Sequence, residues 1–275
     1  MLHAAALLVT MLAPPAATPP APAAPATPAA PAAPAKTDAP AKPAAAAPKA
    51  PAADETGFVA LFNGRDLSGW QGDTTGYLVE NGAIWCGPKG TNLYTAGEYG
   101  NFVLRFEFQL TPGANNGIGV RAPLQGDAAY EGMEIQVLDD GHAMYKGKIA
   151  PWQHHGSVYG IAASHGSTAA LRPTGEWNTE EIVVDGRDVV VTLNGVEINR
   201  ANLDEATRNG TLSKHKHPGL ARTSGHIGFL GHGDRVGYRN IRVKPLPEPK
   251  PAPAAKPATG AAAPTAPATK DAGAR

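Results

Sequence analysis

The chain has 275 residues with 24 basic and 24 acidic side chains, a formal net charge of zero at pH 7, and one cysteine. Seven of the basic and three of the acidic residues lie in the two Ala/Pro-rich ends, so residues 54–244 carry a net charge of −4. A core of this charge lacks the clustered Lys and Arg that nucleic-acid binding needs, and a single cysteine excludes an intramolecular disulfide and a cysteine-based zinc site.

The chain begins with a short apolar run over residues 2–13. This run is similar to the apolar part of a signal peptide, so we predict a signal peptide over residues 1–22 and a periplasmic or secreted protein. Residues 23–53 and 245–275 are mostly Ala and Pro, and they hold too few large apolar side chains to offset the entropy cost of ordering. We predict a disordered linker and a disordered tail there, and one folded domain over residues 54–244. No stretch has the roughly 20 apolar residues that a membrane span requires.

Within the predicted domain, short runs of alternating apolar and polar residues are separated by Gly, Asn and Asp. This period of two predicts β-strands. Asn194-Gly195 is the sequence of a tight hairpin turn, and Asn202 is placed to cap a short helix over residues 203–209. The predicted strands cover residues 58–62, 77–80, 83–86, 102–110, 117–122, 133–138, 180–184, 188–193, 196–199, 225–230 and 237–243.

About eleven strands in under 200 residues predict an all-β fold, a jelly-roll sandwich of two antiparallel sheets. The segment from residue 140 to 167 has little strand character and contains Gly, His, Tyr, Trp and Lys instead. A loop of that length inside a compact domain is usually functional.

The predicted strand over residues 133–138 has an unusual polar face. Its alternation buries Met133, Ile135 and Val137, and it places Glu134 and Gln136 together on the opposite face. Asp139 follows at the end of the strand. A solvated face that ends in a turn is the structural interpretation of this pattern, and a binding surface is the functional one.

The preceding strand favours the functional interpretation. It places Gly117, Gly119 and Arg121 on one face, beside Asn116. If the two strands pair, Arg121 lies opposite the polar face with small residues around it. The simpler outcome is a cross-strand Arg–Glu pair, and the alternative is a polar, sugar-sized pocket over a glycine floor.

Two loops contribute further candidates. Residues 152–160 bring Trp152, His154, His155 and Tyr159 together, which is typical of an active-site loop with acid/base groups and a stacking aromatic. His232 lies in a glycine-rich loop between the last two strands, where turn formation and a site role are equally consistent with the sequence. No metal-binding or phosphate-binding motif occurs, and we predict neither a metal ion nor another cofactor.

These motifs, in their order and spacing, resemble the 3-keto-disaccharide hydrolase family, also described as 3-keto-glucoside 1,2-lyases and 3-keto-2-hydroxy-glucal hydratases. The resemblance covers the whole predicted domain and neither end of the chain. It implies a concanavalin A-like sandwich. The segments that carry it are residues 58–70, 116–121, 130–136, 155–160, 175–178, 225–234 and 238–241.

The resemblance implies a carbohydrate substrate that has been oxidised to a ketone at C3, cleaved by hydrolysis or by elimination and hydration. Such a route needs a base near C2, a donor to the ketone oxygen, and an acid for the leaving group. We assign Glu134 as the base and His155 or Tyr159 as the acid. The residues expected to bind substrate are Arg121, Gln136, Asp139, Asn116, His154, His232 and Trp152.

Three alternatives remain at this point. An ordinary glycosidase would use two carboxylates, Glu134 and Asp139, but these lie on opposite faces of the strand. A non-catalytic carbohydrate-binding module would share the same sandwich fold. A structural protein of the cell envelope would use the Ala/Pro-rich ends as spacers and would have no affinity for saccharides.

Overall fold

The structure, a computed structural model, describes residues 54–247. The predicted signal peptide and linker, and the tail beyond Pro247, lie outside the described residues. Strand β13 (Val236–Pro245) ends at Pro245, and the backbone N–H of Leu246 donates to the carbonyl of Asn101. Strand β13 thus includes one residue beyond position 244.

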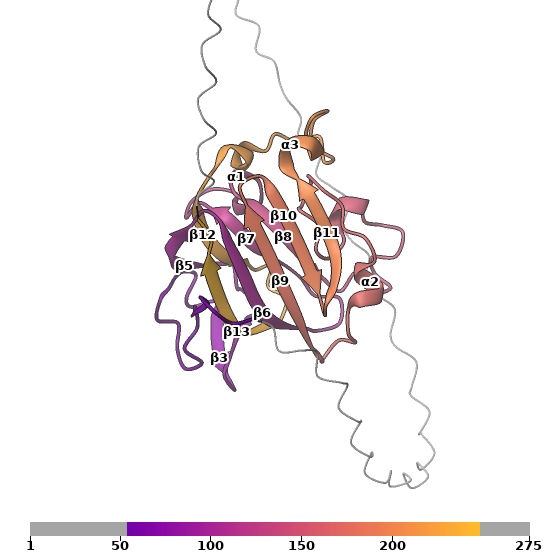
Figure 1. Ribbon diagram of the computed structural model, residues 1–275. Helices are drawn as coiled ribbons and strands as arrows, with labels where there is room; N and C mark the ends of the chain where they lie inside the picture. Colours follow the sequence, from indigo (N-terminus) through magenta and orange to yellow (C-terminus); the bar gives the residue numbers. More distant parts are fainter. Residues whose placement is uncertain (1–53, 248–275) are drawn as a thin grey trace, which may run out of the picture. The chain divides into compact units, whose positions relative to one another are not determined.

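One layer of the protein is an eight-stranded antiparallel sheet, in which strands β9, β10 and β11 lie side by side with β6 (Figure 1). Its order is β11-β10-β9-β6-β13-β4-β3, and β1 pairs with β13. Besides β13, the strands are β1 (Val59–Ala60), β3 (Tyr77–Glu80), β4 (Ala83–Cys86), β6 (Phe102–Leu110), β9 (Trp177–Asp185), β10 (Asp188–Leu193) and β11 (Val196–Asn202).

The other layer is a five-stranded antiparallel sheet with the order β2-β5-β12-β7-β8. Strand β8 forms its edge and pairs with β7, so that Gly119 lies opposite Glu134 and Gly117 lies opposite Gln136. The strands are β2 (Trp70–Gly72), β5 (Asn92–Tyr99), β7 (Asn115–Ala122), β8 (Met133–Leu138) and β12 (Gly225–Leu230).

The two sheets are joined by an apolar core. Strand β6 buries every second residue, from Phe102 to Leu110, as its alternation predicts. Aromatic stacking links the sheets, because the ring of Phe229 on β12 stacks on that of Tyr238 on β13 with centroids 3.9 Å apart. Phe229 also stacks on Trp70, with ring centroids 5.0 Å apart. The predicted fold class, an antiparallel two-sheet sandwich, is confirmed.

Short helices occupy the connections between strands. Asn202 caps α3 (Leu203–Ala206) by accepting from the backbone N–H groups of Asp204 and Glu205, as predicted, although the helix ends three residues earlier than expected. The Asn194-Gly195 turn is also found, with positive φ at both residues. The other helices are α1 (Ala128–Glu131), η1 (Pro151–Gln153), α2 (Ser167–Ala170) and η2 (Pro218–Ala221).

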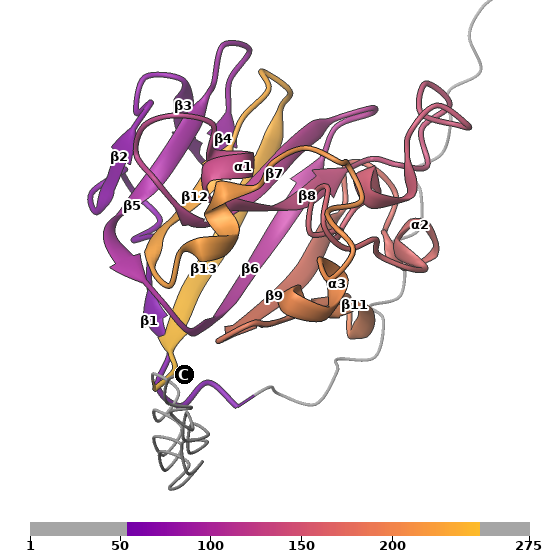
Figure 2. The same ribbon diagram turned by 90° about the horizontal axis from the view of Figure 1, so that it is seen from above.

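The segment between β8 and β9 extends the five-stranded sheet at its edge. Val158 forms an antiparallel bridge with Ile135, and the N–H of Tyr159 donates to the carbonyl of Glu134 at 2.9 Å. Figure 2 shows this rose-coloured segment beside β8, on the side of the sandwich where α2 and β11 lie. It therefore lies along the free edge of β8.

Candidate active site

A cavity of about 280 Å³ lies over the outer face of β8. Glu134 and Gln136 point to this face, while Ile135 and Val137 point into the core. We call this space the main cavity. Its wall comes from β7, β8, α1, the β8–β9 segment and the β12–β13 loop, and its lining residues are Asn115, Asp127, Ala129, Tyr130, Glu134, Gln136, Leu138, Tyr145, Ile149, Gln153, Tyr159 and His232.

The carboxyl of Glu134 is buried without a hydrogen bond from the described part of the chain to offset its loss of solvation. The residue is 4% exposed, and its Oε1 has no hydrogen-bond partner among residues 54–247. Burial disfavours the charged form, and the negative charge of Asp127 adds to this, so the pKa of Glu134 is raised to about 8. A carboxyl held this way binds its proton near neutral pH, which is a common property of catalytic acid/base groups.

Gly117 makes room for this carboxyl. A Cβ at Gly117 would lie 2.6 Å from both Cγ and Cδ of Glu134 and closer still to Oε1. The backbone of β7 is therefore the floor on which the carboxyl rests, and any side chain at this position would displace it. The sequence pattern of glycines in this strand indicated such a floor.

We expect Gly117→Ala to reduce the free energy of unfolding by about 1–3 kcal/mol, because the added methyl overlaps the Glu134 carboxyl in a tightly packed place. Urea denaturation measures the loss. Gly97→Ala is the matched control, since a Cβ at this exposed β5 position meets only the Tyr99 side chain, whose nearest atom, the hydroxyl oxygen, is 3.5 Å away. If Gly117→Ala were as stable as the control, the carboxyl would not rest on this strand.

Hydroxyl and amide groups surround the carboxyl. The side-chain amide of Gln136 donates to Oδ1 of Asn115 at 3.2 Å. The hydroxyl of Tyr159 accepts from the amide of Gln153 at 3.2 Å, which leaves its own proton free to donate. Trp152 packs edge-on against the ring of Tyr159 with centroids 4.9 Å apart, so Trp152 orients the tyrosine rather than lining the cavity.

Two loops close the main cavity from either side. Asp127 caps α1 by accepting from the N–H of Ala129, which fixes its carboxylate beside the cavity. His232 comes from the glycine-rich β12–β13 loop, and Asp234 in the same loop accepts from the backbone N–H of Asn115 at 3.0 Å. This bond ties the loop to the start of β7 and holds the exposed His232 at the cavity mouth.

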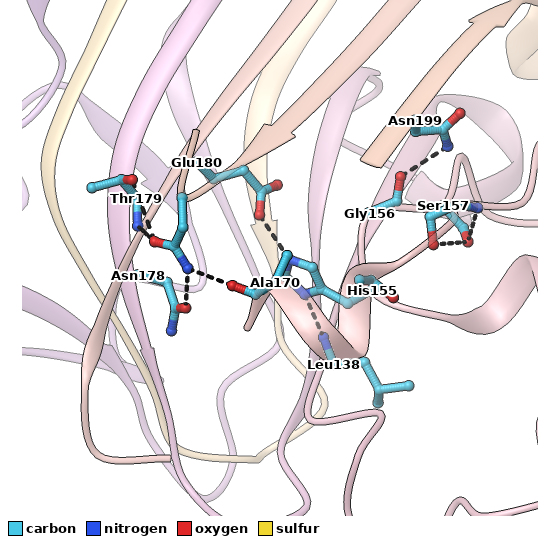
Figure 3. A network of polar contacts seen from close by, with 12 residues as sticks. Leu138, His155, Gly156, Ser157, Ala170, Asn178, Thr179, Glu180 and Asn199 are labelled. Atoms are coloured by element: carbon cyan, nitrogen blue, oxygen red, sulfur yellow. Dashed lines mark hydrogen bonds and ion pairs between the residues drawn. The ribbon is translucent and has the colours of Figure 1, made fainter. Parts of the chain in front are cut away.

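His155 does not lie in the main cavity, in contrast to its predicted role as an acid. Its ring is fully buried between the sheets, where it stacks on Phe108. Nδ1 accepts from the N–H of Leu138 at 3.2 Å, so the proton is on Nε2, which donates to Oε2 of Glu180 at 2.8 Å (Figure 3). His155 joins the edge of one sheet to the centre of the other.

Arg121 also points elsewhere, so it does not pair with Glu134 or Gln136. Its backbone φ is +49°, which interrupts the strand alternation at the end of β7. The guanidinium is buried and donates to the carbonyls of Gly100, Gly186 and Arg222 and to Oδ1 of Asn101. Arg121 binds together the loops at that end of the sandwich.

Three further predicted residues lie outside the main cavity. Asn116 is fully buried on the core face of β7, and its neighbour Asn115 takes the cavity position. Asp139 accepts from the N–H of Gly113 and lines a separate surface cleft. The ring of His154 contacts the buried carboxylate of Asp140 at 3.0 Å, and this carboxylate also accepts from the Ser167 hydroxyl.

Of the predicted site residues, the structure gathers Glu134, Gln136, Tyr159 and His232 around one cavity. Sequence reasoning missed Asp127 and Tyr130, because the short helix that carries Tyr130 and is capped by Asp127 has no periodic signal. Among residues 54–247, no cluster of three or more His, Cys, Asp or Glu side chains is placed to hold a metal ion. Within the same range, no helix is long and apolar enough to cross a membrane.

The fold and the cavity together define the class of protein. It is an antiparallel β-sandwich with a buried, unpaired carboxyl in a polar cavity on the outer face of one sheet. The chain belongs to the family of the 3-keto-alpha-glucoside-1,2-lyase-like domain, whose model matches residues 57–244. The matched range coincides closely with the described sandwich. The family resemblance seen in the sequence motifs is thereby confirmed.

Relatives agree with this assignment. The chain is 27% identical over 233 residues to a 3-keto-disaccharide hydrolase of Bacteroides thetaiotaomicron, which covers 70% of this chain and 80% of the relative. A crystal structure of a protein provisionally named a glycosyl hydrolase, from Parabacteroides distasonis, has a TM-score of 0.62 at 27% identity, over 69% of this chain and 99% of that one. A second structure with the same provisional name and from the same organism has a TM-score of 0.60 at 26% identity, over 70% and 94% of the two chains. The names of these relatives are consistent with the family to which the chain belongs.

Proposed function

We propose that this protein cleaves 3-keto-glycosides, in particular 3-keto-disaccharides, and that Glu134 removes the proton at C2. The observation that carries the proposal is the uncompensated carboxyl of Glu134 at the floor of a polar cavity. A ketone at C3 acidifies the C2 proton, so a single carboxylate can serve as base without a strong cation beside it. The names of the family and of the Bacteroides relative support this substrate class.

The proposed reaction has two halves. In the first, Glu134 takes the C2 proton, the C1–C2 double bond forms, and the bond from C1 to the leaving oxygen breaks. In the second, water adds its oxygen to C1 and a proton returns to C2, which gives a 3-keto sugar. The sum is the addition of one water molecule to the glycoside and the release of one alcohol or sugar.

The other cavity residues take roles that follow from their positions. The Tyr159 hydroxyl has a proton free to donate, and it donates a hydrogen bond to the ketone oxygen as negative charge develops there. His232 stands at the cavity mouth, on a loop fixed by Asp234, and protonates the leaving oxygen. Gln136 and Asn115 hold sugar hydroxyls. His155 and Arg121, whose side chains lie outside the main cavity, take no part in this proposal.

The direct test is incubation with a disaccharide oxidised at C3 and, separately, with the unoxidised disaccharide. We expect release of monosaccharide from the oxidised substrate alone, detected by chromatography. A carbohydrate-binding module would bind the unoxidised glycan and release nothing from either compound, and that outcome would overturn the proposal. A buried carboxyl with a raised pKa favours an enzyme over a carbohydrate-binding module, because binding alone does not require such a carboxyl.

We expect the activity to rise with pH. Below the pKa of Glu134, about 8, the carboxyl is protonated and cannot accept the C2 proton. With a leaving group that needs no proton from His232, such as 4-nitrophenolate, the value of kcat/KM should therefore increase about tenfold per pH unit up to pH 8 and level off above it. Initial rates between pH 5.5 and 9.5 measure this profile. A fall in kcat/KM through pH 8 would mean that Glu134 acts as an acid instead.

A further inference from the structure

A second, smaller cavity adjoins the main one. It has a volume of about 160 Å³ and is lined by Asn92, Gly126, Asp127, Ala128, Ala129, Glu134, Leu230 and His232. We call it the side chamber. Four of its lining residues, Asp127, Ala129, Glu134 and His232, also line the main cavity, so the two spaces meet at Glu134 and His232.

The two spaces differ in chemistry. Besides the residues they share, the main cavity presents hydroxyl and amide groups from Tyr130, Tyr145, Tyr159, Gln136 and Gln153. The corresponding wall of the side chamber is Asn92 with the small or apolar residues Gly126, Ala128 and Leu230. The main cavity therefore suits a sugar ring whose ketone and hydroxyl groups must be hydrogen-bonded. The side chamber suits a group that needs fewer hydrogen bonds.

The side chamber is firmly built. Leu230 and Ala128 belong to a buried apolar cluster with Tyr94 and Ala122 on the outer face of the five-stranded sheet. Gly126 has φ of +86°, and a Cβ there would collide with the carboxyl of Glu131. These contacts fix the wall without occupying the space, which indicates a preformed subsite.

We propose that the side chamber is the subsite for the leaving group, and that it accepts one sugar ring or an aromatic alcohol. This inference rests on the proposed function and deepens it. The bond that breaks then lies at the junction of the two spaces, between the C2 proton facing Glu134 and the leaving oxygen facing His232. The chamber volume, equal to that of about five liquid water molecules, has room for a single small ring.

Narrowing the chamber tests the assignment. In Asn92→Trp the larger side chain enters the side chamber from β5, and the residues that line both spaces are not substituted. We expect kcat/KM for a 3-keto-disaccharide to fall about tenfold or more, while kcat/KM for methyl 3-keto-glucoside, whose leaving group is methanol, stays within about twofold. Asn92→Leu should give a smaller change in the same direction, and it serves if the tryptophan variant does not fold.

Leu78→Trp is the matched control, because Leu78 is 47% exposed on β3 of the other sheet. It should leave both rates unchanged. Equal effects of Asn92→Trp on the two substrates, or no effect on either, would overturn the subsite and leave the proposed function standing. If the wild-type protein cleaved neither substrate, the proposed function would fail and the subsite with it.

Discussion

Glu134→Gln should abolish turnover of 3-keto-glycosides and at the same time make the protein more stable. Glutamine has nearly the same shape, so it retains the packing over Gly117 but cannot accept a proton. Loss of a positioned base costs about 10²–10⁴ in rate. We therefore expect kcat to fall by at least about a hundredfold, measured as monosaccharide release from a 3-keto-disaccharide.

The gain in stability follows from the pKa of Glu134. The carboxyl has a pKa of about 8 in the folded protein and about 4.3 in an unfolded chain, so folding favours the protonated form. Its ionisation therefore lowers stability as the pH rises between these two values. Glu134→Gln removes this loss, and we expect it to add about 2–4 kcal/mol to the free energy of unfolding at pH 8 and little at pH 4.

Urea denaturation at both pH values measures the gain in stability. Glu176→Gln, at an exposed position between α2 and β9, is the matched control and should change neither rate nor stability. Full activity in Glu134→Gln would exclude this residue as the base. A loss of stability at pH 8 would show that the carboxyl has a stabilising partner, contrary to the structure.

The second large effect concerns the buried pair of His155 and Glu180. Removing one partner of a buried, hydrogen-bonded pair typically costs about 3–5 kcal/mol, and Oε1 of Glu180 already has no partner among residues 54–247. We expect His155→Ala to lose this amount, because the N–H of Leu138 also loses its acceptor. Thermal and urea denaturation measure the loss.

The companion variants separate a structural role of His155 from a catalytic one. Glu180→Gln keeps an acceptor for Nε2 and should lose only about 1 kcal/mol. The double variant His155→Leu with Glu180→Leu should recover much of the stability of the wild type, since apolar residues often replace a buried pair without loss. A His155→Ala protein that is fully stable but inactive would restore the predicted catalytic role.

Much of the sandwich was predictable because its strands obey a simple period. The alternation in β6 and the Asn194-Gly195 turn are local signals, and the structure confirms both. Strand β5 was missed because Ala96, Gly97 and Glu98 end its apolar run, and its place beside β12 depends on contacts with residues far away in the chain. The short strand β2 was also missed, because its place in the sheet likewise depends on contacts with residues far away in the chain.

The candidate site was predictable only where the alternation holds. Glu134 and Gln136 lie where the period of β8 places them. The same period, counted from Gly117, puts Asn115 rather than Asn116 toward the cavity. Arg121 does not follow this period, because its positive φ redirects its side chain.

The position of His155 could not be predicted from the residues near it in the sequence. Its neighbours are typical of an active-site loop, but its partner Glu180 lies on the other sheet. Only the packing of one sheet on the other brings the two together. The same is true of Asp127 and Tyr130, which reach the cavity through a four-residue helix.

Deuterium incorporation from solvent is the most direct test of the proposal that Glu134 removes the C2 proton. The protein is given a 3-keto-disaccharide in D₂O, and the released 3-keto sugar is examined by NMR beside samples with Glu134→Gln and with no protein. We predict one deuterium at C2 of the enzymatic product, because elimination removes the C2 proton and hydration replaces it from solvent. A product that retains protium at C2 would show direct hydrolysis and would contradict the proposed role of Glu134.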